Sequence, residues 1–511
     1  MSTKPKILFW LNGFHLHFSL AYYLQSNLNA DFFGIIDINS KPKKFFQNQT
    51  LVKFQKMWFF HDYIKKTQQK PDLEYLINFE KKYKIDLWKY ALNERFFYMH
   101  NRFYKFSKQE ILLILEQELK LFESILDEIK PDYFLTYDPV FHHQKLLLEL
   151  CRLKGIKVLS TMIAAGIQNK TIIVENSSTY DIDPNAITNN LVSNKNIKDE
   201  NNNSYELIIK KNQKSRNVNF VNKFKGLMKY LLDFNSNDED SNFMYYGKSK
   251  FKVTKDAISL ELKRKKNHSF LQKVSESSPN LKNPYIYFPM AIDEEMNILH
   301  YAPYFTNQIE VIRHIAKSMP INYSLYVKEH IAAKLRGWHD IDYYKQLMDI
   351  PNVTFINPKF DHNELLENSQ LLMTIRSSSS LQAMKKCKPV IIFGEHPIEI
   401  MPSIFPVDSI KDLPELIKKA LKHQVDSSDY KKYVELLGDR LFEFNIFEYE
   451  ISRDKAFFAG KTFSNIPISN QTMIDFLNKN KQIFSNLINA HLKIISIQKK
   501  YKISNRNYNK L

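Results

Sequence analysis

Residues 285–422 alternate short apolar segments with segments of helical spacing, and this feature most constrains the fold. The apolar segments are PYIYFPM, YSLYVKEH, NVTFIN, LLMTIRS and PVIIFG, and helical segments from FTNQIEVIRHIAKSM to LPELIKKALKH follow them. Short buried strands that alternate with helices form parallel sheets covered by helices on both faces. This part of the chain is therefore predicted to be a doubly wound, Rossmann-like α/β domain.

The first part of the chain repeats the alternation less regularly. KILFWL, DFFGIID, PDYFLTYD and KVLST are predicted strands, whereas FSLAYYLQSNL, EILLILEQELKLFESILDEI and HHQKLLLELCRLKG are predicted helices. Residues 43–105 are rich in aromatic residues and are interpreted as a helical insertion. The sequence thus predicts an α/β protein with Rossmann-like domains at 1–175 and 281–428. A polar, low-complexity linker or insertion is expected at 176–280, and a helical tail at 429–511.

Composition narrows the classes of function. The chain has 511 residues and a net charge of +18, which favours anionic partners. The charge is spread along the chain without zinc-finger spacing or an aromatic RNA-binding signature, so nucleic acid is not an expected partner. No apolar run approaches the roughly 20 residues that span a bilayer. Cys151 and Cys387 show no metal-ligand spacing, and a reducing cytoplasm is the expected location.

The tail carries an apolar stripe and a basic end. Leu477, Phe484, Leu487 and Ile495 can share one helical face, which is expected to pack on the domains. The lysines from Lys499 onward are expected to contact an anionic membrane surface, which would make the protein peripheral at the inner face of the cell membrane.

Charged residues follow one strand of the second domain. Lys328, Glu329 and His330 come directly after the apolar run SLYV. Open parallel sheets bind ligands at the carboxyl ends of their strands. Lys328 can neutralise a phosphate, His330 can donate to one, and Glu329 can accept from ribose hydroxyls or orient His330.

A serine run marks another strand end. Arg376, Ser377, Ser378, Ser379 and Ser380 lie where a strand passes into a helix. Hydroxyl groups and free backbone N–H groups at a helix start can bind an anion, although serines there also serve as simple helix caps. Because the run belongs to the same predicted sheet as Lys328 and His330, we expect the two to share a phosphate.

Two further strand ends carry carboxylates. Asp293, Glu294 and Glu295 follow one strand, and Glu395 follows another. Glu294 and Glu295 are candidate catalytic bases, whereas Glu395 is a candidate sugar or ribose ligand. The alternative interpretation is a solvated acidic loop.

Histidines follow strands of the first domain. His15 lies in LNGFHLHF and is a candidate base, while Asp138, His142 and His143 lie in TYDPVFHHQ. No further ligands stand at zinc-site spacing, so no metal site is expected. Histidines in such loops are as often structural as functional.

Residues 285–416 resemble the capsule polysaccharide biosynthesis family of GT-B glycosyltransferases, which are related to enzymes that use CMP-Kdo. The resemblance rests on FPMAIDEEMNILHYAP, YVKEH and TIRSSSSLQAMKKCKPVIIFGE. The lysine–glutamate–histidine–proline motif of the family appears here as Lys328–Ile331, with Ile331 in place of proline. The serine-rich turn is similar to nucleotide-binding motifs of bacterial sialyltransferases, but it lacks the usual glycine, and Gln382 replaces a glutamate.

The resemblance implies transfer of a sugar from a nucleotide-activated donor, with a CMP-sugar such as CMP-Kdo favoured, to a saccharide or lipid-linked acceptor. The second domain would hold the donor and the first the acceptor, with no cofactor or metal required. Two alternatives stay open. A CDP-polyol phosphotransferase would release CMP and form a phosphodiester, whereas a non-catalytic relative would bind nucleotides without turnover.

Overall fold

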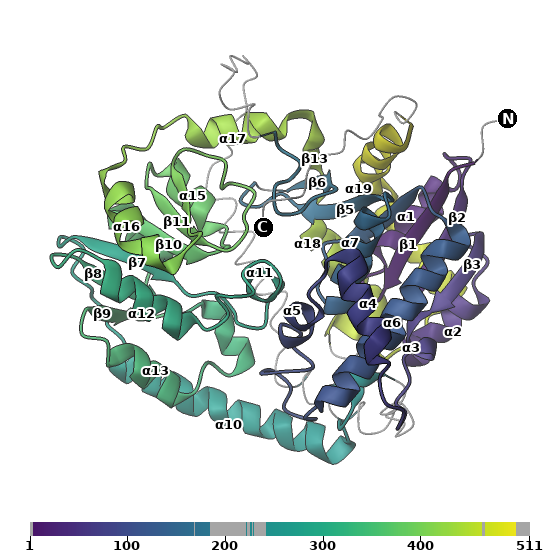
Figure 1. Ribbon diagram of the computed structural model, residues 1–511, viewed down its shortest axis with the longest axis horizontal. Coiled ribbons are helices and arrows are strands. Elements are labelled where there is room, and N and C mark those ends of the chain that lie inside the picture. The colour runs from purple at the N-terminus through teal and green to yellow at the C-terminus, as the bar shows by residue number, and fades with distance from the viewer. Residues whose placement is uncertain are drawn as a thin grey trace.

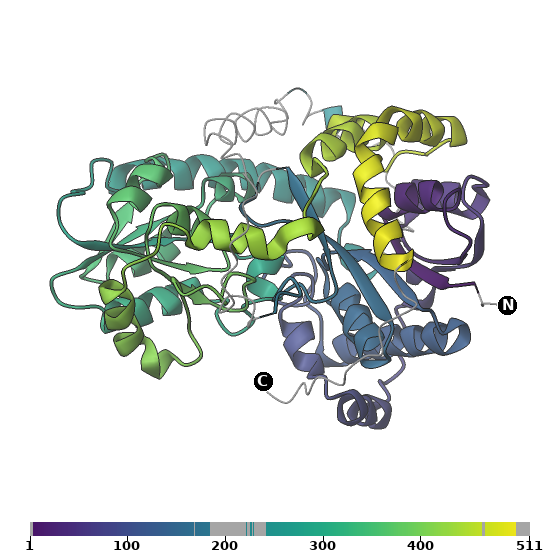
Figure 2. The same cartoon turned by 90° about the horizontal axis from the view of Figure 1, so that it is seen from above.

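Two helix-covered β-sheets form the framework of the protein, and they lie side by side in Figure 1. The computed structural model describes residues 4–167, 169–183, 242–461 and 465–496, together with 221, 225–226 and 228. Figure 2 shows the same two bodies from above.

The first domain begins with five parallel strands. Its elements are β1 (Lys6–Asn12), α1 (Leu16–Leu24), β2 (Asp31–Asp37), α2 (Ser40–Asn48), β3 (Phe54–Phe59), α3 (Phe60–Tyr63), α4 (Leu73–Tyr83), α5 (Leu87–Leu92), α6 (Lys108–Ile129), β4 (Tyr133–Tyr137), α7 (His142–Leu153), β5 (Lys157–Ile163) and β6 (Lys170–Val174). The strand order is β13-β6-β5-β4-β1-β2-β3, in which β6 runs antiparallel to β5. The order reverses between β1 and β4, so the carboxyl ends of these strands flank a switch point.

The second domain has a six-stranded parallel sheet. Before it come η3 (Phe243–Tyr245) and α10 (Lys250–Val274). The domain contains β7 (Tyr285–Pro289), α11 (Met296–Leu299), α12 (Gln308–Ser318), β8 (Ser324–Lys328), η4 (Ile331–Arg336), α13 (Ile341–Met348), β9 (Val353–Ile356), α14 (His362–Asn368), β10 (Leu371–Ile375), α15 (Ser379–Lys385), β11 (Val390–Phe393), β12 (Ile404–Pro406), η5 (Ile410–Asp412) and α16 (Leu413–Lys422). The order β12-β11-β10-β7-β8-β9 places the switch point between β7 and β10.

The C-terminal segment returns to the first domain. It contains α17 (Asp429–Leu437), η6 (Gly438–Arg440), β13 (Phe442–Glu443), α18 (Ile446–Phe457), η7 (Ala459–Lys461) and α19 (Asn470–Ser496). Strand β13 pairs with β6 and completes the first sheet. The apolar stripe of α19, including Leu477, Phe484 and Leu487, is buried in the core that contains α1. The predicted fold, two Rossmann-like domains with a C-terminal helical segment, is therefore confirmed.

Three details differ from the sequence expectations. Within the predicted helical insertion at 43–105, residues 54–59 form the edge strand β3, whose exposed Gln55 and Lys56 hide the usual strand pattern. Helix α10 lies before the predicted boundary at 281, yet Asn267 donates to the Gly337 carbonyl and Leu271 joins the second core. The stripe of α19 packs on the first domain alone. The basic end from Lys499 lies outside the described residues.

No helix within the described part of the chain is long and apolar enough to cross a bilayer.

Candidate functional site

Lys328 and His330 lie at the carboxyl end of β8, as the sequence predicts. Burial lowers the pKa of Lys328 to about 8, although Asp361 opposes the shift. His330 remains accessible, and its Nδ1 accepts from the Ala332 N–H at 3.2 Å as the cap of η4. This bond leaves the Nε2 of His330 to face a ligand.

His362 joins these two residues, and sequence reasoning missed it. It begins α14, after the short loop that follows β9, so the strand-end rule could have found it. Its Nδ1 lies 2.9 Å from the Tyr287 hydroxyl, and its Nε2 lies 3.1 Å from Gln382 Oε1. Burial, and then the charge of Lys328, lower its pKa to about 4. We call Lys328, His330 and His362 the basic cluster.

Glu329 is directed into the protein rather than toward a ligand. Its side chain is fully buried. One carboxylate oxygen accepts from the backbone N–H of His330 at 2.7 Å, and the other accepts from Tyr344 at 2.9 Å and lies 2.5 Å from His339 Nδ1. The geometry therefore supports the second of its predicted roles, orientation of His330.

The serine run forms a tight turn between β10 and α15. Ser377 Oγ accepts from the Ser379 N–H at 3.2 Å and donates to Ser379 Oγ at 3.1 Å. Ser378 is exposed, whereas Ser380 is fully buried. Ser377 and Ser378 are thus the hydroxyls best placed to meet a ligand.

Arg376 points away from this turn. Its guanidinium donates to the Glu395 carbonyl at 2.5 Å and stacks 3.6 Å from the ring centre of Tyr301. Tyr301 Oη donates to Asp138 Oδ1 of the first domain at 2.5 Å. Gly394 permits this arrangement, because a Cβ there would lie 2.5 Å from the Tyr301 carbonyl oxygen. Tyr301 and Asp138 therefore connect the domains, and Arg376, held by the Glu395 carbonyl, packs on the ring of Tyr301.

Asp293, Glu294 and Glu295 form the acidic loop after β7, and their carboxylates have different surroundings. Asp293 Oδ2 lies 2.9 Å from His339 Nε2, and Glu294 pairs with Arg336. Glu295 has no ion pair among the described residues. Burial raises the pKa of Glu295, and Arg95 of the first domain opposes the shift. Glu295 therefore lies close enough to the first domain for Arg95 to influence its pKa.

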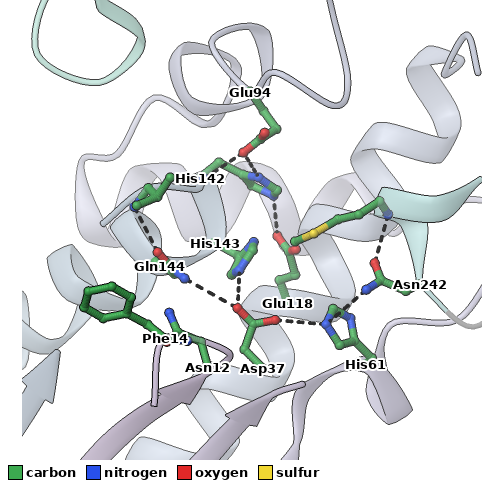
Figure 3. A network of polar contacts seen from close by, with 12 residues as sticks. Asn12, Phe14, Asp37, His61, Glu94, Glu118, His142, His143, Gln144 and Asn242 are labelled. Atoms are coloured by element: carbon green, nitrogen blue, oxygen red, sulfur yellow. Dashed lines mark hydrogen bonds and ion pairs between the residues drawn. The ribbon is translucent and has the colours of Figure 1, made fainter. Parts of the chain in front are cut away.

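His15 is buried within the first domain. It is 2% exposed and contacts the rings of Phe46 and Phe457. Burial, together with Arg453, lowers its pKa to about 3. His142 and His143 belong to a separate buried network at the same edge of the sheet, shown in Figure 3. The structure therefore brings Lys328 and His330 close to His362 and leaves His15 apart from them.

One protein family matches the chain. The model of the capsule polysaccharide biosynthesis protein family matches residues 210–400, which include the basic cluster, the acidic loop and the serine turn. The match confirms the family resemblance drawn from the sequence for this segment. Among curated proteins, no sequence matches significantly.

Solved structures show weak similarity. A KpsC β-Kdo 2,7-transferase of Thermosulfurimonas dismutans has a TM-score of 0.28 and 11% identity, over 59% of this chain and 80% of that one. A UDP-GlcNAc 2-epimerase of Methanocaldococcus jannaschii, in complex with UDP-GlcNAc and UDP, has a TM-score of 0.26 and 11% identity, over 84% and 99%. The UDP-GlcNAc 2-epimerase of Neisseria meningitidis, bound to UDP-GlcNAc, has a TM-score of 0.26 and 14% identity. The alignment covers 85% of this chain and 99% of that one.

Proposed function

We propose that the protein is a metal-independent GT-B glycosyltransferase of surface polysaccharide biosynthesis. It transfers a sugar from a nucleotide-activated donor, with a CMP-sugar such as CMP-Kdo favoured, to a saccharide or lipid-linked acceptor. The observation that carries the proposal is the basic cluster, which lies in the family-matched segment at the carboxyl edge of a Rossmann-like sheet. Lys328 and His362 are half-buried and His330 is exposed, so an anion can reach these basic side chains, and a donor phosphate supplies one.

In the proposed mechanism, the donor phosphate binds Lys328, His330 and the hydroxyls of Ser377 and Ser378. These groups stabilise the negative charge that develops on the leaving phosphate. Glu295 accepts the proton of the acceptor hydroxyl as the new glycosidic bond forms. The acceptor enters from the side of the first domain, toward which Glu295 lies. His15 takes no part, because its ring is enclosed by aromatic side chains.

The first test measures nucleotide binding. His330→Ala, and separately the double change of Ser377 and Ser378 to Ala, should each weaken CMP binding by about 1.5–3 kcal/mol, because each removes contacts to a charged phosphate. Isothermal titration calorimetry gives the affinities. His314→Ala, on α12 and outside the basic cluster, is the matched control and should bind normally. Unchanged affinity in both test variants would reject the site.

Nucleotide affinity should fall as the pH rises. A bound phosphate stabilises protonated Lys328, whose pKa in the free protein is about 8. Above that pH, the neutral amine of Lys328 must therefore take up a proton when the phosphate binds. At pH 7 the side chain of Lys328 is already charged. Calorimetry from pH 7 to 9.5 should show a steady loss of affinity that Lys328→Gln flattens. If the affinity of Lys328→Gln fell equally steeply with pH, a group other than Lys328 would cause the pH dependence.

Turnover should survive removal of exchangeable cations, because protein groups neutralise the phosphate. Product formation from CMP-, UDP- and GDP-sugars, followed with and without EDTA, tests both the activity and the donor. Activity lost on chelation and restored by Mg²⁺ would contradict the metal-independent mechanism. Formation of a phosphodiester instead of a glycoside would identify the phosphotransferase alternative.

The proposed location is cytoplasmic, with a peripheral contact at the inner face of the cell membrane. The basic end from Lys499 would make that contact. Removing residues 499–511 should weaken salt-sensitive sedimentation with anionic liposomes and leave donor binding intact. Equal sedimentation of both forms at low salt would argue against the contact.

A further inference from the structure

Two histidines and a glutamate converge inside the first domain, away from the proposed donor site. Glu118 comes from α6, while His142 and His143 open α7, and all three side chains are fully buried. One potential ligand atom from each lies within 4.8 Å of those of the other two. His142 Nε2 and Glu118 Oε2 are 2.9 Å apart. Figure 3 shows His143 between Asp37 and the pair formed by His142 and Glu118.

Several polar atoms of this group lack hydrogen bonds. Glu118 Oε1 and both ring nitrogens of His143 are buried without a hydrogen-bond partner in the described part of the chain. Nearly all buried polar atoms in proteins are paired, and an unpaired one points to a bound water or ion. Here the unpaired atoms are a carboxylate oxygen and imidazole nitrogens, which are metal ligands.

Both histidines also have a carboxylate on the opposite side of the ring. Glu94 Oε2 lies 2.9 Å from His142 Nδ1 and also accepts from the backbone N–H of His142. Asp37 Oδ2 lies 3.6 Å from His143 Nε2. Metal-binding histidines almost always direct their second ring nitrogen to such a partner, which fixes the tautomer and strengthens the ligand.

We propose that Glu118, His142 and His143 bind one Zn²⁺ ion. A pair of imidazoles with one carboxylate suits Zn²⁺ far better than Mg²⁺ or Ca²⁺, which prefer oxygen ligands. Zinc binding would replace the proton shared by His142 and Glu118, and a small inward rotation of the three side chains would complete the contact. Because the site is closed to solvent, the ion serves to hold α6 against α7.

The competing explanation is a network held by a proton alone. Although burial opposes the charge, Glu118 and Glu94 raise the pKa of His142 to about 10, so without an ion the imidazole is positively charged between the two carboxylates. That arrangement satisfies His142, but it leaves Nδ1 of His143 and the second oxygen of Glu118 without a hydrogen bond. Zinc accounts for both sets of atoms, and this difference favours the ion.

The three proposed ligands do not stand at the spacing of a known metal-binding motif, which explains why the sequence showed no metal site. Glu118 precedes His142 by 24 residues, and strand β4 lies between them in the chain. The inference does not depend on the proposed glycosyl transfer. A buried ion of this kind exchanges slowly, so brief EDTA treatment would not report on it.

The deciding experiment uses the full-length protein, purified without a polyhistidine tag in metal-free buffer. Plasma mass spectrometry should find about one zinc per chain. Unfolding in the presence of a chelator, followed by refolding with Co²⁺, should produce visible d–d absorption, whereas refolding without metal should give a lower Tm. A folded wild-type protein that holds no transition metal and gives no cobalt spectrum would overturn the proposal.

Variants locate the ion. Glu118→Gln and His143→Gln should lose it, with a lower Tm than the wild type. His491→Gln removes a buried histidine of α19 outside the network and should keep the zinc. Zinc retained in both ligand variants would overturn the assignment to these residues. If either variant fails to fold, the cobalt spectrum of the wild-type protein still decides whether the site exists.

Discussion

Glu295→Gln should lower kcat by about 10²–10⁴-fold and leave CMP affinity unchanged, because the proposed mechanism assigns the general base to Glu295 and the phosphate to other residues. Glu295 differs from its neighbours in the acidic loop. Burial raises its pKa, whereas Glu294 is held by Arg336 and Asp293 contacts His339. Steady-state turnover with the donor found by screening, together with calorimetry of CMP binding, measures both quantities.

Glu294→Gln is the matched comparison, because it makes the same chemical change one residue away. We expect a smaller loss of kcat from this variant. Similar losses in both variants would point to a disturbed loop rather than to a base. Full activity in Glu295→Gln would exclude it as the base, and Glu294 would then be the next carboxylate to test.

His339→Ala should destabilise the second domain by about 3 kcal/mol. This value is at the lower end for breaking a buried ion pair, because Tyr344 continues to donate to Glu329 and Asp293 is partly exposed. His339 lies between Glu329 and Asp293, at 2.5 Å and 2.9 Å. Its loss leaves the buried carboxylate of Glu329 without a cation. Hydrogen exchange of the β8 amides reports opening of this domain separately from the first.

The contact of His339 with Glu329 and Asp293 also predicts that the stability of the second domain depends on pH. Although burial opposes the charge, Glu329 and Asp293 raise the pKa of His339 to about 10, compared with 6.5 for an unperturbed histidine. The stabilisation is fully present below pH 6.5 and is lost as the pH rises toward 10. Protection of the β8 amides should therefore decline between pH 7 and 10 in the wild-type protein. A parallel decline in His339→Gln would show that another group titrates.

The second domain could be predicted from sequence because each of its central strands is a short apolar run with a clear helix after it. Strand β8 and helix α13 illustrate this agreement. The first domain was harder to predict. Strand β3 lies at a sheet edge and exposes polar residues, while β13 has only two residues and forms through pairing with a distant strand. Local pattern carries no information about such long-range pairing.

The candidate site was predictable only in part. The strand-end rule locates Lys328 and His330, and the same rule applied to β9 would have added His362. The sequence could not show that Glu329 points inward, because a strand end does not reveal which side chains reach the core. It also could not reveal the bridge from Tyr301 to Asp138, whose residues are 163 positions apart.

The return of the chain to the first domain has a consequence for movement and for dissection of the protein. The described polypeptide leads into the second body before β7 and returns to the first after α16, since β13, α18 and α19 belong to the first domain. This return restricts relative rotation of the two bodies more than a single connection would. It also means that cutting the gene after β6 would remove the last strand and two covering helices of the first body. A self-sufficient N-terminal fragment would need those C-terminal elements joined back to it.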